Sequence, residues 1–171
     1  MTRPVRERID MAVFGPLPAF VRLSLRLTGI DPTRGAAQAA ALLRQASRAA
    51  AAADPAADDP WRAAYARVGL PDDTVAPTAA LRAWAAAPGG VPRQGTVHDL
   101  VNAASLRHGV PAAAYDLARV TGDVWLRPSR GVEWFEPPLG APETVPINEL
   151  ILVDSADAVL ARAWHGAQGA A

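Results

Sequence analysis

The stretch Thr96–Arg119, with the sequence TVHDLVNAASLRHGVPAAAYDLAR, contains both a helix start signal and a helix stop signal. Thr96 is a typical N-cap and Asp99 follows three residues later, so both side chains can accept hydrogen bonds from the first backbone N–H groups. Gly109 suits the left-handed conformation that ends many helices, and Pro111 prevents continuation. The stretch therefore predicts a helix that begins at Thr96 and ends before Gly109.

The two faces of this expected helix differ in chemistry. At helical spacing, one face carries Val97, Leu100, Val101 and Ala104. The opposite face carries Asp99, Asn102 and Leu106. A surface helix would have a wholly polar second face, so the pattern favours a helix with its back in a core and its front at a pocket. A capping Asp99 and a solvated Asn102 fit the same pattern, and the residues alone leave both interpretations open.

The segment Phe20–Gly29, FVRLSLRLTG, alternates between apolar and polar residues. A period of two predicts a half-buried strand, whose polar face carries Arg22 and Arg26. Three helices are then expected before Thr96. The predicted spans are Gly35–Ala53, opened by Asp31-Pro32-Thr33; a helix capped by Asp59 and running to Val68; and a helix capped by Thr78 and ended by Pro88. The expected buried residues of these helices are Leu42, Leu43, Trp61, Ala64, Tyr65, Val68, Leu81 and Trp84, with Arg44 and Arg48 exposed.

The chain after Pro111 has the pattern of a sheet. The expected strands are Asp123–Arg127, Val132–Phe135, Glu149–Asp154 and Ala158–Trp164. The continuous apolar run Ile151–Val153 indicates a strand that is buried on both faces. Helices mainly in the N-terminal part and a mixed sheet in the C-terminal part predict an α+β fold. We expect one domain over residues 1–171, with residues 166–171 as a disordered tail.

The composition excludes several classes of protein. The chain has no cysteine, so disulfides and thiolate nucleophiles are excluded. Its three histidines are scattered along the sequence, so no metal site is predicted. No cofactor is expected either. No apolar run is long enough for a membrane span, and the N-terminus lacks the apolar core of a signal peptide. We therefore expect a cytoplasmic protein with no membrane partner.

Charge is distributed unevenly along the chain, although its formal net charge is +0. Up to Arg48 there are eight arginines against three acidic residues, which leaves this part about +5. Arg22 and Arg26 belong to this basic part and are the candidate RNA-binding residues. An arginine-rich solvated surface explains the same distribution, and the sequence leaves both explanations open.

Several short motifs, in this order and at this spacing, resemble one known family. Asp99-x-x-Asn102 is followed by Gly109-x-Pro111 and by Ala114-Tyr115-Asp116-Leu117; the flanking motifs are Trp61-Arg62-x-x-Tyr65, Gly69-x-Pro71, Gly122-Asp123, Glu133-x-Phe135 and Arg162-x-Trp164. From about Phe14 to His165 the chain resembles the editing domain of the phenylalanyl-tRNA synthetase beta subunit, which is the pair of subdomains called B-three and B-four. It is most similar to free-standing bacterial relatives of that domain.

This resemblance implies an activity and a set of site residues. Synthetase members hydrolyse the ester of wrongly attached tyrosine, because a phenylalanine pocket barely penalises an added hydroxyl. That reaction needs an oriented water and donors for the developing oxyanion. By resemblance the catalytic candidates are Asn102, which holds the water or the ester oxygen, and Asp99, which orients Asn102 or a ribose hydroxyl. The substrate-binding candidates are Ala113, Tyr115, Asp116 and Arg162, and the implied partner is tRNA or aminoacyl-tRNA.

Two features of the chain depart from the family pattern. Synthetase members have His at the position of Ala113, and family members continue beyond the point where this chain ends, so a site of the family type would be incomplete. The missing segment also predicts an exposed sheet edge through which the protein forms a homo-oligomer. Simpler roles stay open, because Asp116 can cap a turn at Leu117–Val120 and Tyr115 can lie in a core. Whether the protein is an enzyme stays open as well: the alternatives to an editing protein are a non-catalytic RNA- or protein-binding module and a protein that binds a small amino acid or ester.

Overall fold

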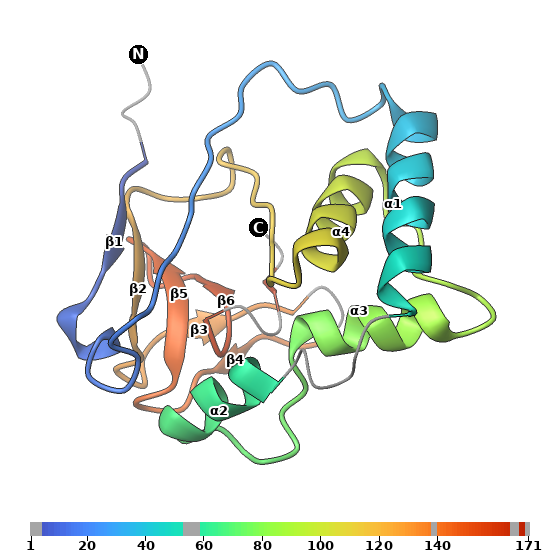
Figure 1. Cartoon of the computed structure of the whole chain (residues 1–171). Helices are drawn as coiled ribbons and strands as arrows, with labels where there is room; N and C mark the ends of the chain where they lie inside the picture. The colour runs from blue at the N-terminus through green and yellow to red at the C-terminus, as the bar shows by residue number, and fades with distance from the viewer. Residues whose placement is uncertain (1–4, 53–58, 138–139, 165–167, 170–171) are drawn as a thin grey trace. The chain divides into compact units, whose positions relative to one another are not determined.

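The computed structural model describes residues 5–52, 59–137, 140–164 and 168–169, which form helices and two sheets in one α+β chain (Figure 1). Contacts divide the chain into two compact units. The helical unit comprises Leu25–Tyr65 and Pro71–Ala114, and the sheet unit comprises Met1–Ser24, Ala66–Leu70 and Tyr115–Ala171. The α+β class predicted from the sequence is confirmed, and each unit is described by itself.

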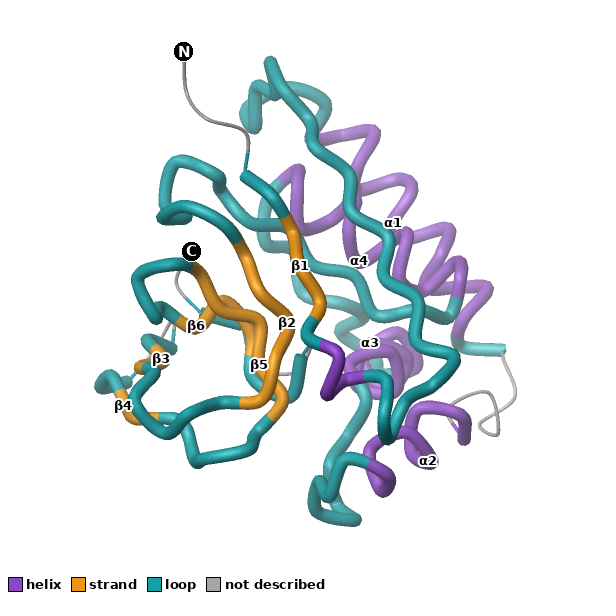
Figure 2. The backbone as a smooth tube through the Cα atoms, turned by 90° about the vertical axis from the view of Figure 1, so that its left-hand side faces the viewer, coloured by secondary structure: helices purple, strands orange, loops and turns teal. Residues whose placement is uncertain are grey.

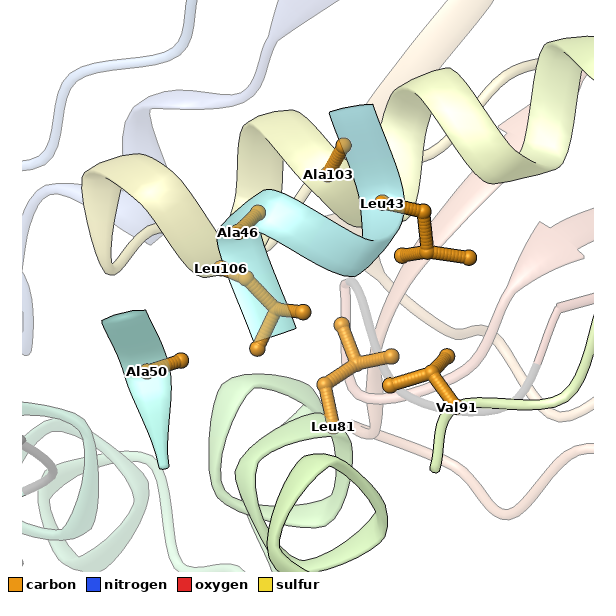
Figure 3. Packing of buried hydrophobic residues seen from close by; sticks show 7 residues of the cluster. All are labelled: Leu43, Ala46, Ala50, Leu81, Val91, Ala103 and Leu106. Carbon is orange, nitrogen blue, oxygen red and sulfur yellow. The ribbon is translucent and has the colours of Figure 1, made fainter. Parts of the chain in front are cut away.

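The core of the helical unit is formed by three of its helices. These are α1 (Ala36–Ala50), α3 (Pro77–Ala86) and α4 (Thr96–His108); α2 (Asp59–Arg67) precedes α3 in the chain. Figure 3 shows the buried side chains that meet there: Leu43, Ala46, Ala50, Leu81, Val91, Ala103 and Leu106. Alanine is the strongest helix former but contributes little volume, so this core is rich in helix propensity and modest in apolar surface.

The four helices lie where the sequence predicts them, but three of them begin differently. The N-caps of α1 and α4 are Gly35 and Gly95, and neither has a side chain that can cap. The N-cap of α3 is Ala76, with a proline in the first turn. Thr96 and Thr78 are therefore inside their helices, and the predictions that they are N-caps were wrong. Asp31 accepts a hydrogen bond from the Thr33 N–H at 2.9 Å in a turn ahead of α1.

The predicted faces of α4 are reversed in the structure. The buried residues of α4 are Asp99, Ala103, Ser105 and Leu106, whereas Leu100 is 43% exposed. Asp99 and Leu106 therefore face the core, although the sequence analysis placed both residues on the face of a pocket. The prediction failed because the face with the carboxylate was not expected to pack in the core, although an ion pair permits the burial of a carboxylate. Leu42 and Trp84, which were expected to be buried, are 42% and 47% exposed.

The sheet unit contains a four-stranded sheet and a two-stranded sheet (Figure 2). The larger sheet has the order β1-β2-β5-β6, formed by β1 (Glu7–Ile9), β2 (Val124–Pro128), β5 (Leu150–Asp154) and β6 (Val159–Ala161). β1 pairs with β2 in parallel, and the other two pairs are antiparallel. The smaller sheet pairs β3 (Trp134–Phe135) with β4 (Glu143–Thr144), and a short 3-10 helix, η1 (Met11–Val13), follows β1.

The central strand β5 confirms a prediction made from its apolar run. Ile151, Leu152 and Val153 are fully buried, so both faces of the strand are covered. The register pairs Leu126 with Leu152 and Trp125 with Val153. The expected strands around β2, β3 and β6 also exist, although β6 ends at Ala161 and the following residues form a turn. β4 was not predicted, because two polar residues carry no strand pattern.

The predicted strand at Phe20–Gly29 is absent. Residues 20–30 form no strand, and Val21, Leu23, Leu25 and Leu27 are all exposed. The residues do alternate between apolar and polar, but no strand among the described residues pairs with the backbone of this segment. A period of two shows which side chains share a face and does not show what pairs with the backbone.

Part of the expected disordered tail is paired. Gln168 forms an antiparallel bridge with Ala161, and the Gly169 N–H donates to the Leu160 carbonyl at 2.9 Å. The rest of residues 166–171 lies outside the described residues. Over the described residues the outer edge of β6, where an exposed edge was predicted, is therefore partly covered.

Candidate functional site

Asp99 is held inside the helical unit by neighbouring groups. Its side chain is fully buried, and one carboxylate oxygen accepts from Arg93 Nε while the other accepts from the Gln94 N–H at 3.1 Å. Arg93 also donates from Nη2 to the Ala36 carbonyl at 3.3 Å. Asp99 thus ties the loop before α4 to the start of α1. These bonds occupy the carboxylate, so its role here is structural, and it forms no hydrogen bond with Asn102.

Asn102 lies one turn after Asp99 on α4 and is half-buried. Its side-chain amide makes no hydrogen bond to another described residue, whereas nearby Ser105 donates from Oγ to the Val110 carbonyl at 2.6 Å. An amide offers a donor and an acceptor without titrating. Asn102 is therefore the site candidate on α4 whose polar group is still available to a ligand or a water.

The candidates Ala113, Tyr115 and Asp116 follow α4 in the chain. Ala113 is half-buried in the helical unit. Tyr115 and Asp116 belong to the sheet unit, so their geometry is separate from that of Asn102. The exposed Asp116 accepts at 2.9 Å from the Ala118 N–H, which is the turn-capping role left open from the sequence.

Tyr115 is the candidate with a strongly shifted pKa. Burial raises the pKa of the Tyr115 phenol to about 12; Arg22 lowers it and Glu7 raises it by smaller amounts. The phenol is therefore a neutral hydrogen-bonding group at physiological pH and does not act as a general base.

Arg162 is fully engaged with two carboxylates of the sheet unit. Its guanidinium donates to both oxygens of Glu149, at 2.9 Å from Nε and 2.6 Å from Nη2, and from Nη1 to Glu143 at 2.6 Å. These partners raise the Arg162 pKa further above its ordinary value. A bidentate pair of this kind fixes the side chain. Arg162 therefore stabilises the sheet unit, and its donors are bonded to glutamates and not available to a substrate.

A second carboxylate of the sheet unit, Glu133, is buried in a cage of donors. It accepts from Ser129 Oγ at 2.8 Å, from the Arg130 N–H at 2.9 Å and from the Arg127 guanidinium. Burial opposes its charge, but the hydrogen bonds from Arg127, Arg130 and Ser129 outweigh burial and hold the Glu133 pKa well below its ordinary range. This matches a structural anion at a position that the sequence analysis used only as a family landmark.

The two arginines proposed from the sequence to bind RNA differ in state. Arg22 donates from Nε to Glu7 Oε1 at 2.6 Å and is partly buried. Arg26 is exposed and has no ion-pair partner among the described residues. Arg26 is therefore available to an external anion, while Arg22 can bind such an anion only if its ion pair with Glu7 breaks.

Helix α1 presents a further pair of arginines, which the sequence predicted to be exposed and counted in the basic N-terminal part without making them RNA-binding candidates. Arg44 and Arg48 are exposed one turn apart, and α1 contains no acidic residue. Neither has an ion-pair partner among the described residues. The signal for this surface was the absence of acids from a helix that carries two arginines on one face.

Two further kinds of site were searched for over the part of the chain that the structure describes. No group of three or more His, Asp or Glu side chains could hold a metal ion there. No helix in that part has both the length and the apolar character to cross a membrane.

Comparison with known proteins gives one result. A family model described as the B3/4 domain matches residues 60–169, which is more than half of the chain. No curated protein and no solved structure matches the chain. The matched range contains α2, α3, α4 and the strands β2–β6, and it excludes α1 and the segment before it.

Proposed function

The chain belongs to the B3/4 domain family, the domain type found in the phenylalanyl-tRNA synthetase beta subunit, and from that membership we propose that it binds tRNA. The observation that carries the proposal is the arginine surface of α1, formed by Arg44 and Arg48. The family supplies the class of ligand, and this surface supplies free cations for its phosphates. We place the function in the cytoplasm, where charged tRNA is found.

Charge availability supports binding through α1. Phosphate contacts need cations that are exposed and not already neutralised. Arg44 and Arg48 meet both conditions, because they are exposed and lack a carboxylate partner among the described residues. Arg26, in the same helical unit, meets them too and is the second contact that we expect. A protein of net charge +0 binds through such a local surface and not through its overall charge.

A second candidate function is hydrolysis of the ester of a mischarged aminoacyl-tRNA. The observation that favours it is the available amide of Asn102 on α4. In this proposal Asn102 orients a water and the ester carbonyl, and Asp99 fixes the loop before α4. Binding remains the first candidate, because Asp99, Asp116 and Arg162 are all engaged with protein groups.

Two double variants test the binding proposal. Arg44→Gln with Arg48→Gln removes both free cations of α1, and tRNA affinity should fall about tenfold at low salt. The matched control is Arg8→Gln with Arg22→Gln, which removes the same charge from two arginines that are already paired with Asp123 and Glu7, and should change affinity about twofold or less. If the two double variants lose tRNA affinity equally, the arginines of α1 attract tRNA only as any positive charge would, and the proposal is contradicted.

The same samples separate binding from hydrolysis. Correctly and wrongly charged tRNA are incubated with the protein, and release of the amino acid is followed. Binding without release supports the first candidate, and selective release from mischarged tRNA supports the second. A protein that binds a free amino acid but no tRNA would contradict both.

A further inference from the structure

The side of α1 that points away from the core of the helical unit forms one continuous exposed face. Residues three or four positions apart are neighbours on a helix, and this spacing brings together six exposed residues, here called the α1 face: Ala37, Gln38, Ala41, Arg44, Gln45 and Arg48. The other side of α1 enters the core through Leu43, Ala46 and Ala50 (Figure 3). The α1 face extends about 16 Å along the helix axis.

Gln38 and Gln45 are the polar residues of the α1 face to which the proposed function gives no role. Both are exposed, and neither side-chain amide forms a hydrogen bond with another described residue. An amide carries a donor and an acceptor, so it can pair with a hydroxyl group, which also donates and accepts. The α1 face therefore offers two cations for phosphates and two amides for neutral polar groups between them.

The residues that α1 lacks show which form of nucleic acid suits this face. The helix contains no acidic residue, which would repel phosphates, and no aromatic residue. Proteins that hold a single strand stack its bases on aromatic side chains. A duplex keeps its bases stacked inside, and a double-stranded RNA presents phosphates and 2′-hydroxyl groups across a wide and shallow minor groove. The α1 face has the groups for the second kind of contact and lacks those for the first.

The small residues of the α1 face permit a close approach to such a groove. Ala37 and Ala41 carry only methyl groups, so they leave room for a rigid surface beside the longer arginine and glutamine side chains. Leu42 is the exposed large apolar residue of α1, and helical geometry places it beside the α1 face and not on it. A flat face with long polar side chains fits a shallow groove.

We propose that the α1 face binds a double-stranded RNA stem, with Arg44 and Arg48 on phosphates and Gln38 and Gln45 on 2′-hydroxyl groups of the minor groove. This inference rests on the proposed function and names the part of tRNA that the surface contacts. A DNA duplex has no 2′-hydroxyl group, so the two amides lose their partners there. The α1 face should therefore prefer RNA to DNA, and a paired stem to an unpaired strand.

Three probes test this preference with the whole protein. They are an RNA hairpin with a fully paired stem, an unpaired RNA strand of the same length, and a DNA hairpin with the same stem sequence. At one salt concentration the RNA hairpin should bind about tenfold more tightly than either of the others. An unpaired strand or a DNA hairpin that binds as tightly as the RNA hairpin would overturn the inference.

The glutamines are tested separately from the charges. Gln38→Ala with Gln45→Ala should weaken RNA-hairpin binding about tenfold, leave DNA-hairpin binding unchanged and keep the salt slope, because no charge is removed. Helical circular dichroism should be retained, since alanine is the better helix former. The control Gln94→Ala removes an exposed glutamine ahead of α4 and should leave binding of all three probes unchanged.

The outcomes separate this inference from the proposed function. If the glutamine double variant weakens RNA-hairpin and DNA-hairpin binding equally, or weakens neither, the glutamines do not read the 2′-hydroxyl groups and the inference is wrong. The proposed function would still stand in that case, provided that Arg44→Gln with Arg48→Gln lowers tRNA affinity. If that arginine double variant leaves tRNA affinity unchanged, the proposed function is contradicted, and the inference with it.

Discussion

Two arginines of the sheet unit, Arg127 and Arg162, differ from Arg44 and Arg48 of α1 in what they contact. In the sheet unit, Arg127 is bonded to Glu133 and Arg162 to Glu149, so each cation is matched by a carboxylate. On α1, Arg44 and Arg48 have no ion-pair partner among the described residues. One residue type thus fixes structure in the first region and is left free for an external anion in the second. Counting arginines in the sequence cannot separate these two roles, because the count does not show which arginines the fold places against a carboxylate.

The first prediction concerns the buried pair of the sheet unit and has the largest expected effect. Glu133→Gln removes the charge that Arg127 and Arg130 surround, and breaking a buried pair costs about 3–5 kcal/mol. The free energy of unfolding, measured with urea, should fall by about that amount. Arg44→Gln is the contrast, because an exposed unpaired arginine should change stability by about 0.5 kcal/mol or less. Equal effects of the two substitutions would contradict the comparison.

The pH dependence of stability gives a second measure of the same carboxylate. The folded pKa of Glu133 lies below its unfolded value of 4.5, so its stabilisation is present above that value and is lost as the pH falls. Wild-type stability should therefore drop on acidification below the unfolded pKa. The Glu133→Gln protein should lack this part of the drop, and parallel pH profiles of the two proteins would show that Glu133 is not the responsible group.

The next prediction concerns Asn102 and applies if the protein hydrolyses mischarged tRNA. Asn102→Ala should lower turnover by one to two orders of magnitude, or roughly 1.4–2.7 kcal/mol, because it removes the oriented donor and acceptor. Its stability should change little, since the amide makes no hydrogen bond to another described residue. Asn102→Asp serves as a control that keeps the size and changes the charge. A variant that loses stability and keeps full specific activity would identify Asn102 as a structural residue.

Much of the fold was predictable because its signals are local. Alanine propensity marks α1, and the run Ile151–Val153 marks the buried strand β5. The faces of α4 were not predictable from spacing, because Asp99 is buried through its pair with Arg93, which lies outside the helix. The segment at residues 20–29 was misassigned for a related reason, since a strand needs a partner as well as a pattern.

The candidate site was predictable in part. The resemblance led to Asn102, whose amide is available, and to Asp99, whose partners Arg93 and Gln94 no motif indicated. Arg162 matched a family motif, but that motif did not indicate its two partners, Glu143 in β4 and Glu149 just before β5. Spacing in sequence identifies residue types that can do chemistry, and only the fold shows which of them are already bonded.

The central claim is that Arg44 and Arg48, which have no ion-pair partner among the described residues, contact tRNA phosphates, and the salt dependence of binding tests it most directly. Each phosphate contact contributes about 0.7–0.9 to the slope of log K against log salt. Relative to the wild type, the slope of the Arg44→Gln and Arg48→Gln double variant should be smaller by about 1.4–1.8, while that of the Arg8→Gln and Arg22→Gln control, whose arginines are already paired with carboxylates, should be unchanged. A slope that is the same for all three proteins would contradict the claim.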